Sequence, residues 1–363
     1  KLVAVLFGRV EHLTDGDAQG ETLQSVAKIY EENFDPPNLD SAFDTLLFAF
    51  ELEYTNEITA SELERLAAAT DRWNGLLTKY NEKVAELTDV ETKCELLVKV
   101  GKWYGSKLSH PEYAIASLQQ ALQLDQNNRS ALAGLGDFYR SQGQWGELAQ
   151  VLSRRTELEE DPEILTGLHQ AMGELYEDKL SNMMDANQAI QLAIGSYQKA
   201  LRADDSNPDA LTALERLYRQ HQQWEQLIEI LKKKAELATE TDAVIEIKYA
   251  IGELYEDRLD DAYRAIESYK EILTVDPQHL PALRSLEKLY EKTGQMEEYL
   301  DVLEQQLDYV GSDEERITKY NQMAAVWEEH FDKISRSTEC YEKILLIDEQ
   351  HENSYRNLER LYR

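Results

Sequence analysis

The sequence has few cysteines, few prolines and no long hydrophobic run, and these shortages exclude several classes of protein. Its two cysteines, Cys94 and Cys340, lie far apart in the chain, which excludes a framework of disulfide bonds. The first apolar run, from Leu2 to Phe7, is too short to span a bilayer, and no later run is longer. We therefore expect a soluble protein with no membrane insertion.

Positive charge is also scarce, because 38 lysine and arginine residues face 70 aspartate and glutamate residues, for a formal net charge of -32. Such a polyanion repels phosphate backbones and anionic lipid surfaces, so we expect no nucleic acid partner. The seven histidines lack metal-ligand spacing, and neither a glycine-rich phosphate loop nor a nucleophile motif occurs. We expect no metal, no cofactor and no enzymatic activity.

What the sequence does have is a fixed period. Four pairs of residues are each 30 positions apart: Trp73 and Trp103, Trp145 and Leu175, Trp224 and Leu254, and Met296 and Val326. The intervals between successive pairs are 42, 49 and 42 positions, so the period is 72 residues with one insertion of seven. A fixed period indicates stacked repeats, each of which buries its apolar face against its neighbours.

The insertion lies within residues 182–193 and carries Met183 and Met184. Methionine is flexible and apolar, so these two side chains are candidates for a contact with a partner. The alternative is a longer helix and loop without a binding role.

Each period contains four amphipathic segments, which predicts two helix hairpins. In the period that begins at Trp224 the segments are 224–238, 242–259, 261–277 and 281–294, with apolar residues at helical spacing. The third segment stops at Asp276-Pro277, where proline prevents continuation of the helix, and the fourth ends at Gly294.

Two stretches carry a known pattern. They are Leu135-Gly136-x-x-Tyr139-x-x-x-Gly143-x-Trp145 and Ala265-x-x-x-Tyr269-x-x-Ile272-Leu273-x-x-x-Pro277, and they resemble the tetratricopeptide repeat. Ten hairpins follow from this register, and eight of them keep the first tyrosine: Tyr30, Tyr104, Tyr139, Tyr176, Tyr218, Tyr255, Tyr290 and Tyr362. Ala67 and Trp327 replace it in the other two. The resemblance implies an all-α, right-handed superhelical solenoid of stacked antiparallel helix hairpins, in which the tyrosines, tryptophans and small residues pack the array.

The repeats predict one continuous array over residues 1–363. Its doublets of hairpins are 1–72, 73–144, 145–223, 224–295 and 296–363. Both ends fall inside a helix of the repeat and lack a polar capping helix, so we expect a fragment of a longer chain.

The resemblance implies that the first helix of each hairpin lines a concave groove that binds a protein or peptide. In alternate hairpins, acids cluster around the conserved aromatic position: Glu31, Glu32, Glu174, Glu177, Asp178, Glu253, Glu256, Asp257, Glu328 and Glu329. The hairpins between them carry bases there: Arg140, Arg216, Arg219, Lys288, Lys292, Arg360 and Arg363. We therefore expect acidic and basic stripes to alternate.

Two interpretations of these stripes stay open. Neighbouring helices neutralise each other through exposed ion pairs, each worth about 0.2 to 1 kcal/mol, or the acids bind basic side chains of a partner. The function we predict is a non-catalytic scaffold for protein–protein interaction whose partner has basic features. The alternative is a structural or self-assembling spacer array.

Overall fold

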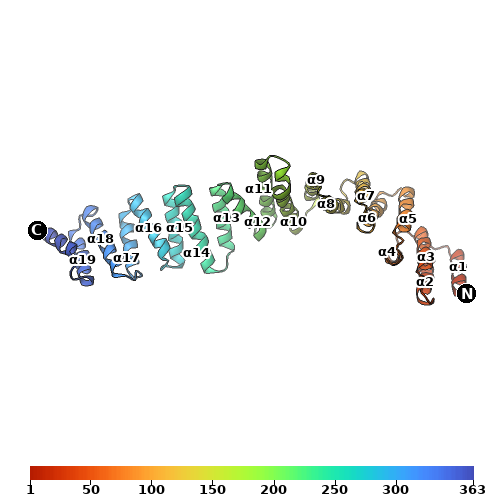
Figure 1. Ribbon diagram of the computed structural model, residues 1–363, viewed down its shortest axis with the longest axis horizontal. Helices are drawn as coiled ribbons and strands as arrows, with labels where there is room; N and C mark the ends of the chain where they lie inside the picture. Colours follow the sequence, from red (N-terminus) through yellow and green to blue (C-terminus); the bar gives the residue numbers. More distant parts are fainter. The chain divides into compact units, whose positions relative to one another are not determined.

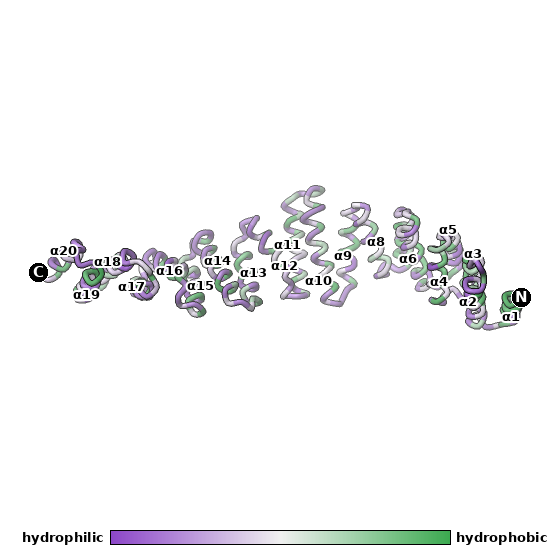
Figure 2. The backbone as a smooth tube through the Cα atoms, turned by 60° about the horizontal axis from the view of Figure 1, so that its bottom comes forward, coloured by the Kyte–Doolittle hydropathy of each residue, from purple (hydrophilic) through white to green (hydrophobic).

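The computed structural model describes residues 1–363 and contains twenty α-helices and no β-strand. Within residues 1–204 and within residues 205–363, successive helices are joined by short loops and run antiparallel to each other (Figure 1). Apolar residues recur along each helix (Figure 2), and those that face a neighbouring helix form the buried core. The all-α fold of stacked helix hairpins is therefore the one that the sequence predicts.

The chain forms two compact units, Lys1–Asp204 and Asp205–Arg363. The first contains α1 (Leu2–His12), α2 (Gly16–Glu32), α3 (Leu39–Leu52), α4 (Glu57–Thr70), α5 (Trp73–Glu86), α6 (Val90–Ser106), α7 (Pro111–Leu124), α8 (Arg129–Gln142), α9 (Trp145–Leu158), α10 (Pro162–Glu174) and α11 (Ala186–Ala203). The second contains α12 (Pro208–Gln220), α13 (Trp224–Leu237), α14 (Thr241–Glu253), α15 (Ala262–Val275), α16 (Leu280–Thr293), α17 (Met296–Leu307), α18 (Asp313–Glu329), α19 (Ile334–Ile347) and α20 (Glu352–Leu361).

Local signals place the ends of these helices. The side chain of Asn128 accepts a hydrogen bond from the Ala131 amide and so caps α8, and Asn207 caps α12 in the same way. Gly143 and Gly294 follow α8 and α16 with φ of 68° and 74°, a backbone conformation that glycine adopts without a steric cost. As a result, the anchor residues of the 72-residue period stand at helix starts, namely those of α5, α9, α13 and α17.

Glycine lets the two helices of a hairpin approach closely. A Cβ atom on Gly252 of α14 would lie 2.5 Å from Cε1 of Tyr269, whose fully buried ring comes from α15. Gly173 and Tyr197 repeat this arrangement between α10 and α11, at 2.6 Å. In both hairpins the ring beside the glycine comes from the second helix.

A cation covers three of the anchor tryptophans. Lys107 lies 5.4 Å from the ring centroid of Trp73, Lys179 lies 5.8 Å from that of Trp145, and Arg258 lies 5.4 Å from that of Trp224. Each cation follows its tryptophan by 34 positions. Cation–π contacts of this kind contribute about 0.5 to 1 kcal/mol at exposed sites. Each one ties the second helix of one hairpin to the first helix of the next.

The first helices α10 and α14 each end in a π-helical turn, Leu175–Lys179 and Leu254–Arg258. Both turns have the sequence Leu-Tyr-Glu-Asp followed by a base. The insertion follows the first of them, and α11 has 18 residues where α15 has 14. Within the insertion Met183 is 66% exposed, whereas Met184 packs against the hydrophobic core. Only Met183 is accessible to a partner over most of its side chain.

Candidate functional site

The first helices of successive hairpins lie beside one another and form what we call the first-helix face. In residues 1–204 this face consists of α2, α4, α6, α8 and α10, and in residues 205–363 of α12, α14, α16, α18 and α20. All ten acids singled out from the sequence lie on these helices or on the π-helical turns that end them. The structure divides them into two groups.

The first group pairs with the next first helix. Arg65 of α4 binds Glu31 of α2 at 2.7 Å, and we call such a contact a ladder pair. Two more ladder pairs join Lys288 to Glu256 at 2.5 Å and Arg360 to Glu328 at 2.6 Å. The three glutamates are only 13 to 21% exposed. Ladder pairs therefore hold neighbouring first helices in register, as the first of our two interpretations predicts for these residues.

Tyrosines of the second helices contact two of these glutamates, Glu256 and Glu328, and also Glu177. The hydroxyls of Tyr269 and Tyr341 donate hydrogen bonds of 3.4 Å to Glu256 and Glu328, and Tyr197 donates one of 3.5 Å to Glu177. Burial opposes ionisation of Glu328, but hydrogen bonds from Ser337 and Arg360 outweigh it, so the pKa of this carboxyl lies below its ordinary value. These glutamates are built into the fold and are poorly placed to leave their partners.

The second group is exposed. Glu174, Asp178, Glu253, Asp257 and Glu329 make no ion pair or hydrogen bond, and we call them the free acids. The tenth predicted acid, Glu32, is 62% exposed and lies 3.7 Å from Lys28 on its own helix. Exposed carboxylates without an ion-pair partner therefore remain on the first-helix face.

The predicted bases have more varied surroundings. Lys288 and Arg360 form ladder pairs. Lys292 binds Asp260 at 2.8 Å, and this ion pair lowers the pKa of Asp260. Arg219 pairs with Glu215 of its own helix, and Arg363, just beyond α20, pairs with Glu359 of that helix. Arg65 was not among the predicted bases, because Ala67 replaces the tyrosine of the repeat two positions later. The position within the repeat could have identified Arg65. Arg65, Lys288 and Arg360 each stand two positions before the conserved aromatic position of their hairpin.

The contact between α6 and α8 differs from the ladder pairs. Gly105 of α6 stands where an acid is expected, and Asp137 of α8 stands at the position of the base. A Cβ atom on Gly105 would lie 2.0 Å from the ring of Phe138, so the aromatic ring rests directly on this glycine. A nonpolar contact thus replaces the ion pair between α6 and α8.

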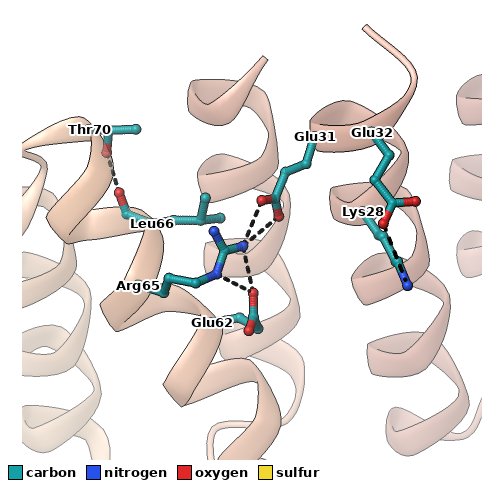
Figure 3. Close-up of polar contacts among 7 residues, drawn as sticks. All are labelled: Lys28, Glu31, Glu32, Glu62, Arg65, Leu66 and Thr70. Atoms are coloured by element: carbon teal, nitrogen blue, oxygen red, sulfur yellow. Dashed lines mark hydrogen bonds and ion pairs between the residues drawn. The ribbon is translucent and has the colours of Figure 1, made fainter. Parts of the chain in front are cut away.

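A hollow of about 360 Å³ opens between α2 and α4, and Figure 3 shows part of its polar wall. Its lining residues are Gln24, Ala27, Lys28, Glu31, Glu32, Leu46, Ile58, Glu62 and Arg65. We call it the α2–α4 hollow. The Arg65 guanidinium lies between two carboxylates, with Nη2 2.7 Å from both Glu31 and Glu62, and these hydrogen bonds raise the pKa of Arg65. Lys28 and Glu32 form a separate pair on the far side of α2 (Figure 3).

No group of three or more histidine, cysteine, aspartate or glutamate side chains is arranged to hold a metal ion. No helix is long and apolar enough to cross a membrane. The hollows are lined by charged side chains that already make ion pairs, such as Lys248 with Glu271 and Lys79 with Glu51.

Comparison with known proteins identifies the repeats. The family model described as tetratricopeptide repeat matches residues 131–166 and 210–242. These segments begin within α8 and α12 and extend past the second helices of the same hairpins. No curated protein matches the chain at a significant level.

Solved structures of repeat proteins are similar to parts of the chain or to most of it. YrrB, described as a tetratricopeptide repeat protein with an unusual peptide-binding site, is 16% identical with a TM-score of 0.32 over 57% of this chain and 96% of its own. A tetratricopeptide repeat protein from Parabacteroides merdae is 13% identical with a TM-score of 0.31 over 95% of this chain and 99% of its own. MamA from Desulfovibrio magneticus is 18% identical with a TM-score of 0.30 over 51% and 96%.

Proposed function

Because this chain is a tetratricopeptide repeat protein, we propose that it is a protein–protein interaction scaffold that binds a partner with basic side chains on its first-helix face. Repeats of this family generally act as non-catalytic scaffolds, and the fold alone does not specify the partner. The observation that carries the proposal is the presence of the free acids. They remain exposed and unpaired, and Glu253, Asp257 and Glu329 lie beside glutamates that the ladder pairs have neutralised.

Electrostatics favours a cationic partner over an anionic one. The formal net charge of -32 attracts basic proteins over long distances at low ionic strength. At physiological ionic strength the Debye length falls to about 8 Å, so only carboxylates close to the bound cation contribute. In residues 205–363 the free acids are Glu253, Asp257 and Glu329, on α14, its π-helical turn and α18. They offer short-range contacts that do not require a ladder pair to break.

A charge reversal tests the proposal. We expect the triple variant Glu253→Lys, Asp257→Lys and Glu329→Lys to bind a lysine-rich peptide at least about tenfold more weakly than the parent. Exposed ion pairs contribute about 0.2 to 1 kcal/mol each, and about 1.4 kcal/mol corresponds to tenfold in affinity. Fluorescence anisotropy with labelled lysine-rich, glutamine-rich and glutamate-rich peptides, at about 0.01 M and about 0.15 M ionic strength, provides the measurement.

The matched control reverses three exposed acids away from the first-helix face. Glu267, Glu298 and Glu304 lie on the second helices α15 and α17 and make no ion pair. Their replacement by lysine changes the net charge by the same amount. If both triple variants lose affinity equally, binding follows the total charge and the proposed face is wrong. If the parent binds no basic peptide and instead assembles with itself as its concentration rises, the spacer-array alternative replaces the proposal.

A further inference from the structure

We propose that the α2–α4 hollow is a pocket for one basic side chain of the partner, with its aliphatic stem against Ile58 and its charge beside the carboxylate of Glu62. This inference rests on the proposed function, because it names what one part of the first-helix face recognises. It also concerns a different part of the chain from the free acids of residues 205–363.

Ile58 is the residue that distinguishes this hollow from the rest of the array. It is 65% exposed in the first turn of α4, nine positions before Ala67. The corresponding residues of the other nine first helices are polar residues, a glycine or a proline: Glu21, Glu95, Ser130, Gly167, Asp209, Glu246, Pro281, Thr318 and Asn353. An isoleucine at this otherwise polar position adds exposed apolar surface to the lining of the hollow.

Ile58 also has apolar neighbours inside the hollow. Leu46 of α3 and Ala27 of α2 line the same space, and both are only 2% exposed as residues. Lysine and arginine bury their methylene stems against apolar surface of this kind while the charged head stays near water. The hollow therefore provides an apolar wall for a stem.

The charges around the hollow complement one positive charge. Three carboxylates, Glu31, Glu32 and Glu62, face two cations, Lys28 and Arg65, so the formal sum is one negative charge. Arg65 is already engaged by two carboxylates, so its guanidinium is not free to bind an incoming anion. Both hydrogen bonds from Arg65 to Glu62 use Oε2, so Oε1 of Glu62 accepts none from Arg65. A single incoming ammonium or guanidinium group brings the formal charge to zero.

Methyl NMR of the full chain tests this pocket. The probes are short glycine- and serine-flanked peptides that are identical except for a central lysine, arginine, norleucine or glutamate. We expect the lysine and arginine peptides to shift the δ1 methyl resonance of Ile58, and the norleucine and glutamate peptides to leave it in place. Ile58→Ser should weaken the lysine peptide at least about fivefold, and Glu62→Gln should weaken it while Glu31 still holds Arg65.

Ile164→Ser is the matched control, because Ile164 of α10 is also exposed, at 45%, and does not line the hollow. It should leave the affinity unchanged within about twofold. Since Ile58 is exposed, both serine variants are expected to keep the helical circular dichroism of the parent. Binding of norleucine as strong as that of lysine would show a purely apolar pocket and overturn the inference.

The outcomes also separate this inference from the proposed function. If lysine peptides bind and shift only methyl groups of residues 205–363, such as those of Ile251, the scaffold proposal stands and the pocket is wrong. If no basic peptide binds either region, the proposed function itself fails. Shifts at Ile58 that disappear in Ile58→Ser and weaken in Glu62→Gln support both.

Discussion

Replacement of Gly252 by alanine tests how closely α14 and α15 pack against each other. The added methyl carbon would lie 2.5, 2.7 and 2.9 Å from three carbons of the Tyr269 ring, whereas carbons in contact prefer about 3.5 to 4.0 Å. Since Tyr269 is fully buried, α14 and α15 must separate or the ring must tilt. Overpacking of this kind costs about 1 to 3 kcal/mol, and the better helix propensity of alanine returns about 0.5 to 1 kcal/mol.

We therefore expect Gly252→Ala to lower the free energy of unfolding by about 1 to 2 kcal/mol. Ala324 occupies the corresponding position of α18, whose partner helix α19 carries Tyr341 at the place of Tyr269. Alanine and tyrosine therefore occupy these two positions together elsewhere in the chain, and the cost of Gly252→Ala follows from the short distances between the added methyl carbon and the Tyr269 ring.

Gly136→Ala is the control. A Cβ atom there would lie 3.7 Å from Val151 and 3.8 Å from Leu148, which is ordinary van der Waals contact, so the propensity gain of about 0.5 to 1 kcal/mol is expected to dominate. Urea unfolding followed by far-ultraviolet circular dichroism compares the two variants with the parent. The reasoning is refuted if Gly252→Ala is as stable as the parent, or if the two alanine variants shift stability in the same direction.

Three further predictions concern polar groups. Tyr80→Phe should raise the free energy of unfolding by about 1 kcal/mol in urea titrations, because the buried Tyr80 hydroxyl has no hydrogen-bond partner; a loss of stability would contradict this. Lys319→Met should lower the thermal midpoint and cost about 2 to 4 kcal/mol, because it leaves the mostly buried Glu287 carboxylate without its cation, and a cost below that of an exposed pair would argue against burial. The lowered pKa of Glu328 means that its ionised form stabilises the fold above the ordinary value of 4.5, and this contribution disappears as the pH falls through the lower folded-state pKa. The stability difference between the parent and Glu328→Gln should therefore shrink below about pH 4.5, and a difference that stays constant with pH would exclude this linkage.

Much of the fold could be predicted because the 72-residue period places equivalent residues at equivalent helix positions. Trp73, Trp145, Trp224 and Met296 repeat, and a helix begins at each of them. The period could not reveal the π-helical turns, because they change the backbone hydrogen bonds of a sequence that also suits an α-helix. These turns contain Glu177, Asp178, Glu256 and Asp257, so the backbone geometry around four predicted acids could not be predicted from the period.

The site was predicted as a set of acids, but their division was not. Glu256 and Asp257 are adjacent and chemically alike, yet Glu256 is held by Lys288 and Tyr269 while Asp257 makes no ion pair or hydrogen bond. Only the direction of each side chain distinguishes them, and that depends on where the next hairpin lies. Ile58 was visible in the sequence as an apolar residue at a polar position, but its significance depends on the hollow that α2, α3 and α4 enclose.

Because Gly105 and Phe138 form a nonpolar contact, the joint between α6 and α8 responds to ionic strength differently from the joint between α2 and α4. Salt weakens the ion pair of Arg65 with Glu31, in which the arginine side chain is about half exposed, whereas salting-out ions strengthen the burial of an aromatic ring. In a sulfate solution the joint between α2 and α4 should therefore loosen while the joint between α6 and α8 tightens. Within residues 1–204, mechanical stiffness is then not uniform along the stack, and the ions around the protein decide which joint bends first.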